Sequence, residues 1–267
     1  AIARRDENRS SRTVWYWKRL LVGSRQAYIH PIPTTVMRVA LVSVGDELLA
    51  GETVNTNAAW LGRQLHDRGV SVGRITSIPD DVATIARVVN ELHAEFDAVI
   101  VTGGLGPTHD DVTVEGVAAA FGRAVEPHEQ ALEWIEEHGE YAAADLAEGT
   151  AALPVGARQL PNRVGVAPGF VVENCYVLPG VPDEMQAMFA DVADEFAGDR
   201  TFVEFVEIAE PESALLERIE RLRSDFQVSI GSYPGENVRI RIEADDEAVV
   251  GDAASWLRER VQVPEER

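Results

Sequence analysis

The sequence predicts an α/β protein that consists of a three-layer αβα sandwich with a mostly parallel sheet and a small C-terminal α+β domain. Two observations indicate the sandwich. Short apolar runs alternate with helical patterns along residues 39–121, which is typical of parallel strands joined by helices that cover both faces of a sheet. The third apolar run also ends in a glycine-rich turn. Ligands of such sheets bind outside the carboxyl ends of the strands, so the turns after the strands are candidates for a site.

The elements of the sandwich follow from apolar runs and from capping residues that precede apolar residues at helical spacing. Thr56 or Asn57 is expected to cap a helix that ends at Gly69. The predicted strands are 39–44, 70–77, 96–101 and 174–178, and further helices start at 79–81, run over 113–121, and run from 182 to about 196. Residues 126–149 are expected to form an acidic helical insertion, and residues 159–172 extended segments or a hairpin.

The small domain is predicted from a second series of elements after a boundary at 197–199. Strands are expected at 201–208, 228–232 and 238–242, with a turn at Pro234 and Gly235, and helices at 211–226 and 247–261. The predicted domains are therefore 37–198 and 199–267, and the second, with about 70 residues, is of a size that folds only marginally alone.

Residues 1–36 differ from the rest of the chain. They hold seven basic and two acidic residues, and Met37 stands directly before the first predicted strand. We expect this segment to be a disordered or spurious N-terminal extension. A targeting segment is the alternative, but its apolar content is interrupted.

The charge of the chain restricts its partners. Acidic residues number 45 and basic residues 24, for a net charge of −21, and no lysine follows Met37. Such a charge argues against nucleic acid and anionic membranes. The acidic, lysine-poor composition resembles that of proteins from salt-loving archaea, although an ordinary acidic protein is the alternative. The single cysteine, Cys175, fits a reducing cytosol, so a cytoplasmic location is expected.

The central candidate site is the stretch that follows the third strand. Three glycines and Pro107 precede two adjacent carboxylates and Thr113. Glycines ahead of a helix allow backbone N–H groups to approach a phosphate. Carboxylates repel phosphate unless a cation or a proton lies between them, so this stretch predicts a phosphorylated ligand with a metal or acid–base chemistry. A tight turn with Asp111 as a helix cap is the structural alternative. The candidate residues are Thr102, Gly103, Gly104, Gly106, Pro107, Asp110, Asp111 and Thr113.

Three other turns at the same predicted edge supply weaker candidates. Asp80 in a Pro-Asp-Asp turn is a cap or a second carboxylate for a shared cation or water. In the first loop, the acidic side chains are either solvated or part of the site, and the asparagines either cap a helix or bind a heterocycle or ribose. These candidates are Gly45, Asp46, Glu47, Asn55, Asn57, Asp80, Pro179, Gly180 and Pro182. The histidines lack metal-ligand spacing, and His109 is as consistent with a solvent-facing position as with catalysis.

Four motifs resemble those of one family. VSVGDELLAGETVNTN at 42–57, VTGGLGPTHDDVT at 101–113, VGVAPGF around Gly169 and LPGVPDEM around Gly180 are similar to the N-terminal region of the competence/damage-inducible protein A (CinA) family, within the MoaB/Mog molybdopterin-binding superfamily. SIGSYPG in the tail resembles the second domain of the same proteins.

The resemblance implies functions for this pocket. In the molybdopterin adenylyltransferases of the superfamily, the two important aspartates match Asp80 and Asp111. In the CinA branch, the pocket is linked to metal-dependent hydrolysis of nucleotide pyrophosphates such as ADP-ribose. Asp110 stands where the adenylyltransferases usually have arginine, which favours the hydrolase. The amidase domain that follows in the full bacterial proteins is not part of this chain, so nicotinamide-nucleotide amidase activity is not expected.

The sequence therefore favours a nucleotide pyrophosphatase. Asp80, Asp110 and Asp111 are the catalytic candidates, and Asp110 and Asp111 are the candidates for binding a divalent cation (Mg²⁺, Mn²⁺ or Co²⁺). The alternatives are binding or adenylylation of molybdopterin, and a non-catalytic ligand-binding module. A nucleotide or pterin is the expected small-molecule partner, and the resemblance implies self-association into a homo-oligomer.

Overall fold

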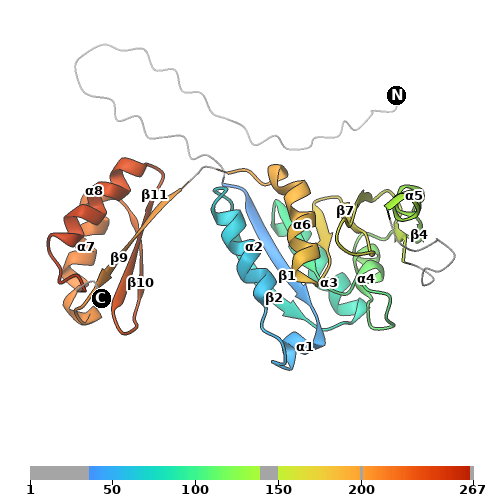
Figure 1. Ribbon diagram of the computed structural model, residues 1–267, viewed down its shortest axis with the longest axis horizontal. Helices are drawn as coiled ribbons and strands as arrows, with labels where there is room; N and C mark the ends of the chain where they lie inside the picture. Colours follow the sequence, from blue (N-terminus) through green and yellow to red (C-terminus); the bar gives the residue numbers. More distant parts are fainter. Residues whose placement is uncertain (1–35, 139–149, 199–200, 265–267) are drawn as a thin grey trace, which may run out of the picture. The chain divides into compact units, whose positions relative to one another are not determined.

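The structure is a computed structural model that describes residues 36–138, 150–198 and 201–264 (Figure 1). The expected N-terminal extension lies outside these residues except for Val36, and so does the second half of the expected helical insertion. Within the described part of the chain, no helix is long and apolar enough to cross a membrane.

A six-stranded sheet forms the centre of the larger body. Its order is β2-β1-β3-β8-β7-β6. The pairs β1–β2, β1–β3 and β3–β8 are parallel, whereas β7 is antiparallel to both β8 and β6. The prediction of a mostly parallel sheet is therefore confirmed. The strands are β1 (Arg38–Val44), β2 (Ser71–Ile78), β3 (Ala98–Thr102), β6 (Arg158–Leu160), β7 (Gly169–Val172) and β8 (Cys175–Leu178).

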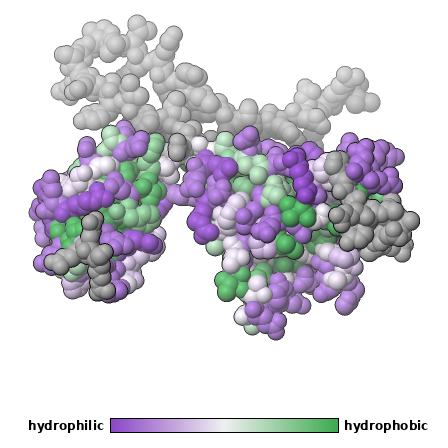
Figure 2. All heavy atoms as spheres, in the orientation of Figure 1, coloured by the Kyte–Doolittle hydropathy of each residue, from purple (hydrophilic) through white to green (hydrophobic). Residues whose placement is uncertain are grey.

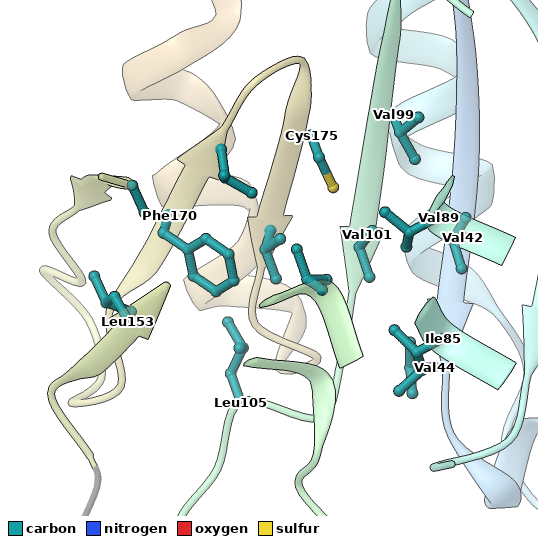
Figure 3. Close-up of a cluster of buried hydrophobic side chains, with 14 of the residues drawn as sticks. Val42, Val44, Ile85, Val89, Val99, Val101, Leu105, Leu153, Phe170 and Cys175 are labelled. Atoms are coloured by element: carbon teal, nitrogen blue, oxygen red, sulfur yellow. The ribbon is translucent and has the colours of Figure 1, made fainter. Parts of the chain in front are cut away.

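Helices cover both faces of this sheet, because successive side chains of a buried strand point to opposite faces. Leu41 of β1 belongs to the apolar cluster under α2 (Thr56–His66) and α6 (Pro182–Val192). Val42, the next residue, belongs to the cluster under α3 (Val82–Glu95) and α4 (Thr113–Ala120). Figure 3 shows Val42 beside Val89 in the second cluster, with Val99 and Val101 of β3. The expected three-layer arrangement is confirmed.

The helix starts depend on side-chain caps. Asn55, and not Thr56 or Asn57, caps α2, because the Asn55 Oδ1 accepts a hydrogen bond from the Ala58 N–H at 3.0 Å. Asp81 caps α3 by accepting from the Thr84 N–H at 2.7 Å. The cap therefore lies one or two positions earlier than expected. As a result, Asn57 belongs to the first turn of α2.

The region after α4 differs from the prediction of one helix from residue 126. A short strand, β4 (Val125–Pro127), pairs with β5 (Ala152–Pro154), and α5 (Glu129–His138) begins only after β4. Pairing with a distant strand overrides the local helical pattern here. The expected hairpin at 159–172 is confirmed, since β6 and β7 are antiparallel. A four-residue helix, α1 (Asp46–Leu49), was not expected.

The C-terminal region is a second α+β unit, as predicted. Its antiparallel sheet has the order β10-β11-β9, and Val206, Ile240 and Leu257 lie in its core. Its elements are β9 (Phe202–Ile208), η3 (Glu212–Ala214), α7 (Leu216–Phe226), β10 (Ser229–Tyr233), β11 (Val238–Ala244) and α8 (Glu247–Arg258); the remaining short helix, η2 (Ala193–Glu195), follows α6.

Figure 2 shows hydrophilic residues over most of the visible face. Apolar residues form small patches there, and one of them lies at the end of the larger body that carries α1. The composition predicts a charged surface. Exposed apolar patches on it are therefore candidates for contact with a ligand or partner.

Candidate functional site

Four loops meet at the carboxyl edge of the parallel strands. Ser43 of β1 pairs in register with Ser77 of β2 and with Thr102 of β3. Beyond the strands, the Gly45 N–H donates to the Ile78 carbonyl, and the Gly103 N–H donates to the Leu178 carbonyl, each at 3.1 Å. The structure therefore brings together the loops that carry all the predicted site residues.

The glycine turn after β3 requires glycine for geometric reasons. Gly103 has φ 101° and Gly104 has φ 63°, values that residues with a side chain rarely adopt. A Cβ on Gly103 would lie 2.3 Å from the Val44 carbonyl oxygen. The Gly103 N–H is already bonded to Leu178, so the amides of Gly104 and Gly106 are the remaining candidates for binding a phosphate.

Asp80 joins two of the loops. Its Oδ2 accepts a hydrogen bond from the Asp46 N–H at 2.9 Å. Its Oδ1 lies 3.5 Å from the position that a Cβ on Gly104 would take. Burial raises the pKa of Asp80, and repulsion from the carboxylates of Asp46, Glu47 and Asp110 raises it further. The hydrogen bond from the Asp46 N–H lowers this pKa but does not cancel the increase. Asp80 therefore holds a proton more readily than an ordinary aspartate.

Asp111 stabilises its own loop and does not cap α4. Its Oδ2 accepts from the Thr108 N–H at 3.0 Å and from the Thr108 hydroxyl. A Cβ on Gly106 would lie 2.6 Å from the same carboxylate oxygen. The N-cap of α4 is Val112, without a side-chain hydrogen bond. The structural alternative of an Asp111 cap is therefore wrong.

Asp110 and His109 face solvent. The Asp110 side chain is 66% exposed and that of His109 is 99% exposed, with 3.7 Å between His109 Nδ1 and Asp110 Oδ1. Hydrogen bonding from the Thr108 side chain, followed by that from the backbone N–H of Asp110 itself, lowers the pKa of Asp110. Asp110 is therefore an ionised carboxylate at the outer side of the turn.

Thr113 lies beneath the glycine turn and not at its surface. Its side chain is fully buried, and its N–H donates to the Gly104 carbonyl at 3.1 Å. Its hydroxyl would lie 2.2 Å from a Cβ on Gly104 and has no hydrogen-bond partner. Thr113 thus supports the turn, and its contact with Gly104 explains why no larger residue fits there.

A small pocket of about 120 Å³ lies on one side of the glycine turn. It is lined by the β1–α2 segment, by Gly103, and by the loop after β8. Asn57 spans it, because its Nδ2 donates to the Gly180 carbonyl at 2.7 Å. The lining residues are Ser43, Val44, Glu47, Leu48, Thr53, Val54, Asn55, Thr56, Asn57, Thr102, Gly103, Gly180 and Pro182. Pro179 is not among them.

A larger pocket of about 320 Å³ lies on the other side of the turn. It contains the predicted Gly104, Gly106, Pro107 and Asp111. Sequence reasoning missed Glu115, which lies in the first turn of α4. It also missed the wall formed by Val114, Val125, Thr150, Ala152, Leu153 and Pro168. Three of these residues, Val125, Ala152 and Leu153, belong to short paired strands that carry little local signal.

The charges around both pockets are of one sign. Neither set of lining residues contains lysine or arginine, whereas Glu47, Asp111 and Glu115 are present. Carboxylate oxygens are suitable ligands for Mg²⁺. However, the described residues contain no group of three or more His, Cys, Asp or Glu placed to hold a metal ion by themselves. A cation at this turn would therefore need oxygens of a ligand to complete its coordination.

Residues 40–198 match the family described as the probable molybdopterin binding domain. The chain belongs to this family. A relative from Archaeoglobus fulgidus is 37% identical over 225 residues, covering 84% of this chain and 97% of the relative. A CinA-like protein of Citrifermentans bemidjiense is 39% identical over 241 residues; the match covers 84% of this chain but only 58% of that protein.

One solved structure supports the fold. The CinA protein of Thermoplasma acidophilum, described as of unknown function, is 36% identical with a TM-score of 0.56, and the match covers 60% of this chain and 98% of that chain. The resemblance to CinA and to the molybdopterin-binding fold is therefore confirmed. The relatives come from archaea and bacteria and do not support the expectation of a haloarchaeal source.

Proposed function

We propose that this protein binds a nucleotide pyrophosphate together with a divalent cation and hydrolyses its phosphoanhydride bond, with ADP-ribose as the substrate. The main support is a glycine turn surrounded by carboxylates, with no basic residue in either adjoining pocket. A diphosphate carries negative charge, so it requires a cation to approach these groups. Because Mg²⁺ is often held by one or two carboxylates and by substrate phosphates, such a site needs no complete set of protein ligands.

The residues of the glycine turn have distinct roles in this proposal. The N–H groups of Gly104 and Gly106 bind one phosphate. Asp110 and Asp111 supply carboxylate oxygens to the cation (Mg²⁺, Mn²⁺ or Co²⁺), for which the ionised state of Asp110 is required. The cation, when bound, neutralises phosphate charge and activates water. Thr108 fixes the Asp111 carboxylate by donating two hydrogen bonds to it.

Asp80 is the proposed proton acceptor. The oxygen of water forms a bond to one phosphorus while the bridging P–O bond breaks, which gives AMP and ribose 5-phosphate. Asp80 takes the proton of the attacking water, and a carboxyl group with a raised pKa performs this better than an ordinary one near neutral pH. The bond from the Asp46 N–H keeps the Asp80 carboxylate oriented.

The test is release of AMP from ADP-ribose with Mg²⁺, Mn²⁺ or Co²⁺ at high salt, measured by chromatography. The Asp111→Asn variant, which keeps the shape of the side chain, is expected to lose activity. Glu52→Gln is the matched control, because Glu52 is an exposed acid of the first loop outside both pockets. No AMP release from the wild-type protein with any of the three metals would contradict the proposal.

Molybdopterin binding or adenylylation is a second candidate, supported by the family match over residues 40–198. The same turn would then bind a pterin phosphate. Molybdopterin binding without AMP release from ADP-ribose would favour this candidate. Failure to bind either ligand would favour a non-catalytic module.

A further inference from the structure

Hydroxyl and amide side chains line the small pocket beside apolar ones, and Glu47 supplies its one carboxylate. Val54 and Val181 form what we call the rim: Val54 lines the pocket, and Val181 lies between the lining residues Gly180 and Pro182. Their side chains are 79% and 53% exposed. Both side chains are therefore available to an apolar group at the pocket mouth.

Most polar groups at the base of the pocket already have partners. Asn55 accepts from the Ala58 N–H and donates to the Ser43 hydroxyl at 2.9 Å. The Ser43 hydroxyl also accepts from Thr102 at 3.4 Å. This buried network is therefore satisfied within the protein, and it forms a rigid base for the pocket.

Two acceptors remain. Asn57 uses its Nδ2 to bind the Gly180 carbonyl, and its Oδ1 is buried without a hydrogen-bond donor. A buried acceptor without a partner destabilises the protein, so a donor that reaches it is expected to strengthen binding. The Glu47 carboxylate lies against Gly45, within 2.4 Å of the position of a Gly45 Cβ. The pocket therefore offers acceptors to a ligand that carries O–H or N–H donors.

The size of the pocket limits what enters it. About 120 Å³ corresponds to roughly four water molecules. One sugar ring matches this space and also supplies adjacent hydroxyl groups as donors. The rim, by contrast, offers apolar surface and no hydrogen-bonding side chain, which suits the flat face of a nucleobase without selecting its edge.

We propose that the small pocket binds the ribose of the nucleotide through Glu47 and Asn57 while the base lies on the rim, so that the protein recognises the sugar and not the base. This inference rests on the proposed nucleotide ligand and specifies how it is recognised. It assigns specificity to residues outside the reacting centre, because neither Glu47 nor Asn57 contacts the phosphates in this arrangement.

The experiment compares the affinities of ADP, 2′-deoxy-ADP and IDP with Mg²⁺ by calorimetry, on the full chain. Loss of a hydroxyl that donates to a charged acceptor is expected to weaken binding by about tenfold or more. Replacing adenine by hypoxanthine is expected to change affinity by less than about threefold, since only apolar contact is involved. Glu47→Gln is expected to reduce the discrimination between ADP and 2′-deoxy-ADP, and Glu52→Gln is expected to retain it.

Each outcome separates this inference from the proposed function. Equal affinity for ADP and 2′-deoxy-ADP would overturn the ribose assignment, and a strong preference for ADP over IDP would overturn the rim assignment. ADP-ribose hydrolysis would stand in both cases. Absence of nucleotide binding would overturn both proposals. Asn57 also binds Gly180, so two substitutions at this position are compared. Asn57→Asp keeps an acceptor of similar shape, whereas Asn57→Ala removes it. The comparison distinguishes lost ligand recognition from lost folding.

Discussion

Asp80 accepts a hydrogen bond from the backbone N–H of Asp46 at 2.9 Å, which joins the loop after β2 to the loop after β1. This bond orients a carboxyl group whose pKa is raised by burial. Asn at position 80 can still accept from Asp46 but cannot take a proton. We therefore expect Asp80→Asn to lower kcat for ADP-ribose hydrolysis by about 10²–10⁴-fold with little change in Tm. Equal losses of activity and Tm would indicate a structural role instead.

Gly103→Ala is expected to prevent formation of the glycine turn. The added Cβ would lie 2.3 Å from the Val44 carbonyl oxygen, at a φ of 101°, so stability should fall by more than about 1–3 kcal/mol. Gly62→Ala is the control, because nothing lies within 4 Å of that Cβ in α2. Helix propensity predicts that this control gains about 0.5–1 kcal/mol. Denaturant unfolding of both variants is the measurement.

Asn174→Ala is expected to destabilise the larger body from the edge opposite the site. The Asn174 Nδ2 donates to the carbonyl oxygens of Phe96 at 3.0 Å and of His93 and Asp97 at 3.2 Å, and its Oδ1 lies 2.7 Å from His93 Nδ1. Loss of these bonds after α3 should cost about 1–3 kcal/mol. Unfolding curves check the size of this effect, and ligand affinity, measured at a temperature where the variant is folded, should not change.

The acid stability of the C-terminal region should depend on Glu210. Arg218 donates to both of its carboxylate oxygens, at 3.0 and 2.7 Å, and the Gln262 N–H donates at 2.7 Å. Hydrogen bonding from Arg218, followed by that from Gln262, lowers the pKa of Glu210. A lowered folded-state pKa stabilises the fold above the unfolded value, near 4.5, and this stabilisation disappears as pH falls through the folded-state pKa.

We therefore expect Glu210→Gln to be destabilised at neutral pH and to approach the wild-type stability in acid. Urea unfolding at several pH values measures this difference. Glu217→Gln is the control, since Glu217 and Arg221 form an exposed pair on α7 that contributes little. A difference for Glu210→Gln that stays constant across the acid range would contradict the assigned pKa direction.

Thermal stability is expected to rise with KCl concentration. The chain has a net charge of −21, so its acidic side chains repel one another. At 0.1 M, salt screens this repulsion beyond about 10 Å. Scanning calorimetry in KCl and in an uncharged osmolyte of equal osmolality separates screening from general exclusion effects. A Tm that does not change with KCl would contradict the interpretation of the acidic composition as an adaptation to salt.

The positions of the loops could be predicted from the sequence because parallel strands place their carboxyl ends together. Gly45, Asp80 and Gly103 follow the first three predicted strands, and hydrogen bonds join their loops in the structure. Side-chain roles within a loop were harder to predict. Asp111 has the spacing of a cap, yet its carboxylate accepts a hydrogen bond from Thr108, three positions earlier, within its own loop.

Strand pairing between distant segments also limited what could be predicted from the sequence. Residues 125–127 carry a weak local signal, and only pairing with residues 152–154 makes them a strand. Leu153 in this pair lines the larger pocket, so this part of the pocket wall had no counterpart in any local pattern. Glu115 lies in the first turn of a helix that the sequence did predict, but no local pattern marked it as a pocket residue.

The close approach of two glycines has a consequence for exchanging parts between related proteins. A Cβ on Gly180 would lie 3.3 Å from the Cα of Gly103, and Asn57 binds the Gly180 carbonyl. The loops after β3 and β8 and the first turn of α2 therefore form one interlocked set, although they are far apart in sequence. A chimera that transplants any one of these segments alone introduces a mismatch at the other two, whereas transplanting all three together preserves the contacts between them.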